Sequence, residues 1–135
     1  MTAFSELMKL HHIGIACESI NTGIKDVRKI YDVVNISEVV YDERQKASLC
    51  LIETRNGLNI ELVSGEQVKS LLAKEISYYH VCYTVLDIHK EIGRLKKQGA
   101  IVVSEPKPAI LFNNRQVAFL YTNIGLIELL EFDGE

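Results

Sequence analysis

The sequence predicts an α+β protein of two tandem βαβββ modules, whose strands form a curved, half-barrel mixed sheet with the helices on its outer face. Three observations support this fold class. The strand-like segment around His12 recurs at a constant offset around His80. With a one-residue deletion, the segment 57–62 recurs in the same way at 125–129. Between these segments, each repeat has one stretch in which apolar residues follow helical spacing.

The first module is expected to span about residues 9–64. Residues 10–17 alternate between bulky and small side chains, which predicts a strand. Ser19 or Asn21 then caps a helix, whose apolar positions are Ile20, Ile24, Val27, Ile30, Tyr31 and Val34. Three short strands separated by turn residues complete the module, at 37–42, 47–54 and 57–63.

The second module is expected to span about residues 77–132, after a short helix within 65–76. It begins with a strand, continues with a helix that Asp87 caps and Gly99 ends, and closes with three strands. These strands are expected at 78–85, 100–104, 115–121 and 125–132. The segment 106–114 contains two Pro and two Asn and predicts a long irregular loop. Without a linker rich in Pro, Gly or Ser, the modules form one domain over residues 1–135.

The composition is that of an ordinary globular protein of 135 residues, with 47% apolar and 24% charged residues. A net charge of −3 without a basic stripe argues against nucleic acid or an anionic membrane as a partner. Residues 1–9 lack the pattern of a signal peptide, and no apolar run reaches the length of a membrane span. The three cysteines lie in apolar runs, as expected for reduced, buried thiols in a cytoplasmic protein.

Strand alternation places four polar side chains opposite the faces expected to pack on the helices. They are His12, Glu61, His80 and Glu128. Any one of them could be an ordinary core or edge-strand residue, but two carboxylates at repeated positions among aliphatic neighbours are costly to bury without a cation. Two imidazoles and two carboxylates suit one divalent ion, which can be Zn²⁺, Ni²⁺, Co²⁺, Fe²⁺ or Mn²⁺. The repeat aligns His11 with Tyr79, so His12 is the predicted ligand of that adjacent pair.

Several of these segments resemble the vicinal oxygen chelate superfamily, and within it the glyoxalase I and methylmalonyl-CoA epimerase branch. The similar segments are 10–16, 60–62, 79–81, 115–120 and 125–130. The resemblance covers about residues 9–132 and implies the glyoxalase/bleomycin-resistance-like fold. It also implies one metal held by the four predicted ligands and a substrate chelated through adjacent oxygens. The ring-cleaving dioxygenases of this superfamily keep two His and one carboxylate as metal ligands. The fourth ligand, Glu61, therefore argues against that branch.

The resemblance implies a lyase or isomerase that removes a proton next to a carbonyl and stabilises an enediolate on the metal. Glu128 is the expected base, and Glu61 its counterpart and second acid/base. The first expectation is a glyoxalase I-like enzyme, a lactoylglutathione lyase or a lyase of a related thiol adduct. An acyl-CoA epimerase like methylmalonyl-CoA epimerase is the alternative, favoured by the helix within 65–76. A non-catalytic, resistance-type binding protein is a third, against which the intact ligand set counts.

The remaining site candidates are residues that can hold the substrate. Arg44, Arg55, Lys107 and Arg115 are the candidates for binding a substrate anion. Cys82 shares the ligand face with His80 and is a candidate for lining the pocket. The sheet edges, the apolar fraction and the resemblance together predict a homodimer.

Overall fold

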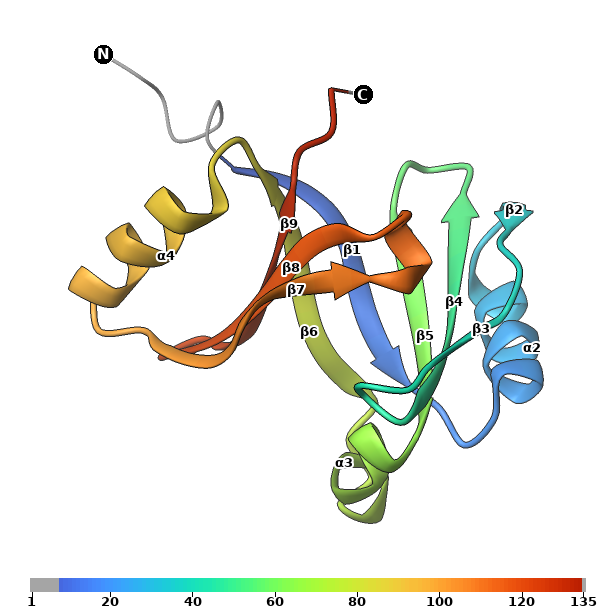
Figure 1. The fold of residues 1–135 in the computed structure, drawn as a ribbon. Coiled ribbons are helices and arrows are strands. Elements are labelled where there is room, and N and C mark those ends of the chain that lie inside the picture. Colours follow the sequence, from blue (N-terminus) through green and yellow to red (C-terminus); the bar gives the residue numbers. More distant parts are fainter. Residues whose placement is uncertain (1–7, 135) are drawn as a thin grey trace. The chain divides into compact units, whose positions relative to one another are not determined.

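The computed structural model describes residues 8–134 and divides the chain into two compact units (Figure 1). The first unit comprises residues 12–79, and the second comprises residues 80–134 together with 8–11. Among the described residues, no helix is long and apolar enough to cross a membrane. The signal-peptide prediction concerned residues 1–9. Of these, residues 1–7 lie outside the described part of the chain.

The first unit is built on a mixed sheet with the strand order β2-β4-β5-β1, and β3 also pairs with β4. Its elements are β1 (Met8–Ala16, of which the first four residues belong to the second unit), α2 (Ile20–Ile30), β2 (Val33–Ile36), β3 (Val40–Asp42), β4 (Ala47–Thr54), β5 (Asn59–Gly65), η1 (Glu66–Val68) and α3 (Lys69–Ala73). β4 runs antiparallel to β2, β3 and β5, whereas β1 and β5 are parallel.

The second unit repeats this plan with the strand order β6-β9-β8-β7. Its elements are β6 (Tyr78–Val85, of which the first two residues belong to the first unit), α4 (Ile88–Lys97), β7 (Ile101–Ala109), η2 (Ile110–Phe112), β8 (Arg115–Thr122) and β9 (Gly125–Glu131). Here β6 and β9 are the parallel pair, and β8 is antiparallel to both β7 and β9. The predicted α+β class is therefore confirmed.

Each long helix packs its apolar stripe on one face of its own sheet. In the first unit, Ile20 and Val27 of α2 lie in one core cluster with Ile60 and Leu62 of β5. In the second unit, the equivalent cluster joins α4 to β6, β8 and β9. Its buried members are Val85, Ile88, Ile92, Ala118, Leu120, Ile127 and Leu129. Because strand residues alternate between faces, the residues between these core positions point to the opposite face of each sheet.

The predicted helix starts are confirmed by their capping bonds. Ser19 caps α2, since its hydroxyl accepts a hydrogen bond from the backbone N–H of Thr22. Asp87 caps α4 by accepting from the N–H of Lys90. Each bond satisfies one of the free N–H groups of a first helical turn.

The end of α2 differs from the sequence prediction, which carried the helical pattern to Val34. The helix ends at Ile30, and Val33 begins β2. The backbone N–H of Arg55 donates to the carbonyl of Asp32, and its guanidinium pairs with the Asp32 carboxylate. These bonds tie the chain to the sheet, where the β-branched Val33 and Val34 pack more easily than in a helix. Of the strand predicted at 37–42, only β3 is formed, and β2 precedes it at Val33–Ile36.

The loop predicted over 106–114 is largely wrong, because residues up to Ala109 belong to β7. Proline is tolerated there since β7 lies at the end of the strand order, where one side of a strand needs no ladder partner. The pairing with β8 also shifts its register between Ser104 and Lys107. Only η2 and the turn at 113–114 are irregular, and both Asn residues of this turn have positive φ.

Two helical glycines give a matched test of the packing. A Cβ added at Gly23 of α2 would lie 2.9 Å from Leu62 Cδ1 and 3.0 Å from Cys17 Sγ, whereas one added at Gly93 of α4 meets nothing within 4 Å. We expect Gly93→Ala to stabilise the protein by about 0.5–1 kcal/mol. Gly23→Ala should be less stable than Gly93→Ala by about 1–3 kcal/mol, the usual cost of overpacking. Urea unfolding measures both, and equal stabilities would contradict the close helix–sheet contact.

Candidate metal centre

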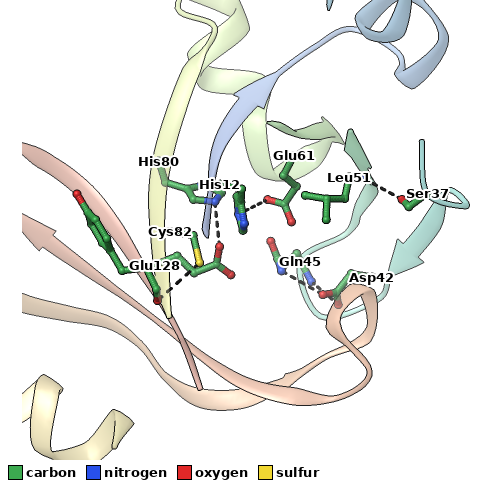
Figure 2. Close-up of polar contacts among 10 residues, drawn as sticks. His12, Ser37, Asp42, Gln45, Leu51, Glu61, His80, Cys82 and Glu128 are labelled. Atoms are coloured by element: carbon green, nitrogen blue, oxygen red, sulfur yellow. Dashed lines mark hydrogen bonds and ion pairs between the residues drawn. The ribbon is translucent and has the colours of Figure 1, made fainter. Parts of the chain in front are cut away.

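The first unit holds a buried His–Glu pair on the face of its sheet that points away from α2. β1 and β5 run parallel with Gly14 opposite Glu61. His12 lies two residues before Gly14, so its ring and the Glu61 side chain share one face. His12 Nε2 is 3.6 Å from Glu61 Oε1, and the two residues are 0% and 4% exposed. Figure 2 marks this contact by a dashed line.

The second unit holds an equivalent pair. β6 and β9 run parallel with Cys82 opposite Glu128, and His80 lies two residues before Cys82. His80 Nε2 is 3.0 Å from Glu128 Oε1 (Figure 2). These residues are 1% and 3% exposed. The same strand pairing therefore positions an imidazole and a carboxylate in both units.

The chemistry of these donors fits a divalent metal ion. A buried carboxylate is costly unless a cation or hydrogen bonds compensate it, and imidazole nitrogen with carboxylate oxygen is a common ligand set for Zn²⁺, Fe²⁺, Mn²⁺ and related ions. Each unit thus carries a buried His/Glu pair of the kind that holds such an ion. The strand registers show that both pairs lie on the sheet faces opposite the helices, as the sequence predicts.

Phe119 is a site residue that the sequence analysis missed. It lies opposite Glu128 in the β8–β9 pairing, and its ring meets that of His80 edge-on, at a centroid distance of 5.4 Å and an interplanar angle of 89°. In the first unit, Leu51 takes the corresponding place opposite Glu61. The repeat itself carried the signal, because the constant offset that relates His12 to His80 also relates Leu51 to Phe119.

Cys82 lies where the sequence analysis expected it, on the face that carries His80. It is fully buried opposite Glu128, and its thiol donates to the carbonyl of Tyr83 at 3.9 Å. A pocket-lining role for Cys82 remains a prediction. The other two thiols lie in the core cluster beneath α2. Burial raises the pKa of Cys17 to about 11 and also raises the pKa of Cys50, as expected for thiols that stay protonated.

Arg115 and Lys107, two of the cationic candidates, lie in the second unit. Arg115 Nε donates to the carbonyl of Glu131 at 2.9 Å and lies 3.6 Å from the Asp133 carboxylate, so it holds the chain that follows β9. Lys107 is exposed in β7 opposite Val117, rather than in a loop. Substrate binding by either residue remains a prediction.

The cationic candidates of the first unit are Arg44 and Arg55. Arg44 is exposed in the β3–β4 turn, where its backbone N–H donates to Asp42 Oδ1. The side chain of Asp42 also accepts from the Gln45 amide (Figure 2). Arg55 pairs with Asp32 at 2.7 Å, so it serves the contact that ends α2. A substrate role for Arg44 also remains a prediction.

His11 is half-buried, and its ring packs edge-on against Phe112 of η2 with centroids 5.3 Å apart. His12, not His11, makes the contact with Glu61.

An apolar cavity of about 450 Å³ also lies in the first unit, between α2 and the β1–β5 strands. Its lining includes Ile15, Val27 and Ile60, which belong to the helix side of the sheet, so this cavity is separate from the His12–Glu61 pair.

The chain is an α+β protein with one buried His–Glu pair in each of its two units. The family model for the glyoxalase/bleomycin resistance protein/dioxygenase superfamily matches residues 11–119. The chain belongs to this superfamily, as the resemblance in the sequence implied.

Solved structures share the fold over nearly the whole chain. Methylmalonyl-CoA epimerase from Mycobacterium tuberculosis has a TM-score of 0.80 at 21% identity, with 98% of this chain and 93% of that chain covered. The epimerase from Streptomyces coelicolor has a TM-score of 0.72 at 17% identity, with 95% and 96% covered. A hypothetical protein from Bacillus halodurans has a TM-score of 0.73 at 24% identity, with 95% and 96% covered. A search of curated proteins found no significant match.

Proposed function

We propose that this chain is a metal-dependent enzyme that removes a proton from a carbon next to a carbonyl group. The observation that supports it best is the buried His–Glu pair repeated at equivalent strand positions in both units. A duplicated structural core needs no buried carboxylate at these positions, whereas a metal site uses both side chains of each pair.

In this proposal the two pairs bind one divalent ion together. His12, Glu61, His80 and Glu128 are its four ligands. Their two carboxylates formally balance the charge of the ion, and four protein ligands leave coordination positions for two substrate oxygens. When bound, the ion supplies Lewis acidity that stabilises negative charge on the substrate during proton removal.

Two carboxylates of this chain act as the proton acceptor and donor. Glu128 is the proposed base, which takes the proton from the substrate carbon and holds it on its carboxyl group. Glu61 is the proposed second acid/base. A base on each side of a planar intermediate lets a proton leave from one face and return to the other, or move between adjacent carbons. Phe119 packs on His80 and helps to fix the orientation of the imidazole beside Glu128.

Two substrate classes fit this chemistry. A glyoxalase I-like lyase would act on the thiol adduct of a 2-oxoaldehyde, and this is the activity that the sequence places first. An acyl-CoA epimerase would invert the carbon next to a thioester. The fold shared with two methylmalonyl-CoA epimerases and the short helical segment 66–73 support this second candidate.

Proton exchange with solvent tests the proposal directly. Metal-loaded protein in deuterated water should exchange the hydrogen next to the carbonyl of one substrate class, which NMR detects as loss of that proton signal. The test compares the hemithioacetal of methylglyoxal and glutathione with a 2-methyl-branched acyl-CoA thioester. Exchange of the thioester alone, with inversion, identifies the epimerase. Binding of either compound with neither exchange nor conversion to product would contradict the enzyme proposal and favour the binding protein.

A further inference from the structure

The two units differ in the row of residues next to the His–Glu pair. In the second unit, Tyr121 pairs with Ile101 of β7 and with Leu126 of β9. Tyr121 and Leu126 lie two residues from Phe119 and Glu128 along their strands, so all four share one face. The row Ile101–Tyr121–Leu126, here called the apolar row, therefore lies about 7 Å along the strands from Glu128.

The corresponding row of the first unit is polar. Glu53 pairs with Asn35 of β2 and with Asn59 of β5, and it lies two residues beyond Leu51 on the face that carries Glu61. The Asn35 amide donates to the Glu53 carboxylate at 2.9 Å. The same fold thus tolerates hydrogen-bonding side chains at these positions, which means that the apolar row is not required by the packing of the sheet.

The apolar row is accessible to solvent. Ile101 is 68% exposed, Tyr121 is 55% exposed, and Leu126 is half-buried. Scattered apolar residues on a surface need no explanation, but three neighbours in one cross-strand row form a continuous apolar patch. This patch is continuous with Phe119, which packs on His80.

We infer that the apolar row binds a hydrocarbon substituent of the substrate whose oxygens are chelated at the His–Glu pairs. This inference rests on the proposed metal site and narrows its substrate class. The ligand is a compound with two adjacent oxygens and an aliphatic or aromatic group long enough to extend about 7 Å along β8 and β9. A substrate with only a methyl group next to its chelating oxygens, such as the two compounds of the exchange test, would bind at the metal without covering the row and therefore more weakly than one with a longer group.

Alkyl hydroxamates test the inference without relying on turnover, because each chelates a metal through two adjacent oxygens. Calorimetry on metal-loaded protein would compare acetohydroxamate, butyrohydroxamate and hexanohydroxamate. We expect affinity to rise by about two- to fourfold for each added methylene that the row buries. Ile101→Asn and Tyr121→Glu, which introduce the residues of the polar row, should flatten this dependence and leave acetohydroxamate binding within about twofold of the native protein.

Leu86→Asn is the matched control, since Leu86 is 60% exposed in the second unit and lies outside the row. It should keep the native dependence on chain length. Equal affinity of the native protein for all three hydroxamates would overturn this inference alone, whereas failure to bind any of them would overturn the metal site as well. If Ile101→Asn halves the mass in sedimentation and leaves the chain-length dependence unchanged, the row is a contact between copies and the inference is wrong.

Discussion

Glu128→Gln is expected to reduce turnover by roughly 10²–10⁴-fold, the usual cost of losing a general base. The substitution keeps the shape of the side chain and one oxygen that can bind a metal, but it removes the proton acceptor. Metal content and substrate affinity should therefore change little. Steady-state kinetics, together with metal analysis of the same preparation, would measure this separation. Unchanged turnover would contradict the assignment of Glu128 as the base.

The control for this substitution lies on the same strand. Glu131→Gln changes a carboxylate three residues further along β9, on the opposite face of the sheet. It should leave turnover close to that of the native protein. Glu61→Gln distinguishes the two candidate activities. It should be as damaging as Glu128→Gln if a proton must pass between two faces of the substrate, and milder if Glu61 is mainly a ligand.

His12→Ala and His80→Ala should each abolish tight binding of the metal, because each removes one of four ligands from a single proposed centre. The loss of affinity should exceed the roughly 10–100-fold that loss of an outer hydrogen-bond partner of a ligand costs. The native protein should retain about one divalent ion per chain after dialysis, and both variants close to none. Atomic emission spectrometry measures the metal content, and competition with a chromophoric chelator measures the metal affinity.

His89→Ala controls for general effects of losing a histidine, since His89 is exposed on α4. It should retain the metal. If His12→Ala lost metal while His80→Ala kept a full equivalent, the His12–Glu61 pair would bind the ion by itself. That result would refute the single four-ligand centre while leaving the fold and the family unaffected.

The sequence predicted best the sheet face on which each strand side chain lies, because this depends only on alternation along the strand. Glu61 and Glu128 each lie between aliphatic residues that must face a helix, so their side chains point to the other face wherever the strands pair. The repeat then predicted that His12, rather than His11, belongs to the same set as His80. Both pairs are formed in the structure, at 3.6 Å and 3.0 Å.

The errors arose where contacts distant in the sequence override local preference. Pro106 and Pro108 led to the prediction of a loop. They lie instead in β7, the last strand in the order, because this segment pairs with β8. The α2 pattern continued past Ile30, but the bonds between Asp32 and Arg55 place the next residues in the sheet. The repeat relates Phe119 to Leu51, but its contact with the His80 ring becomes visible only once β8 pairs with β9 and places Phe119 opposite Glu128.

The form of β7 has a consequence for how copies of this chain can assemble. An exposed strand at the end of a sheet is a template on which another chain can add a strand, and such addition leads to aggregation as readily as to ordered assembly. β7 lacks two backbone donors at Pro106 and Pro108, carries Lys107 between them, and shifts its register twice. These features protect the β7 edge from strand addition. The homodimer that the sequence predicts should therefore form through side-chain contacts on another surface and leave this edge in water.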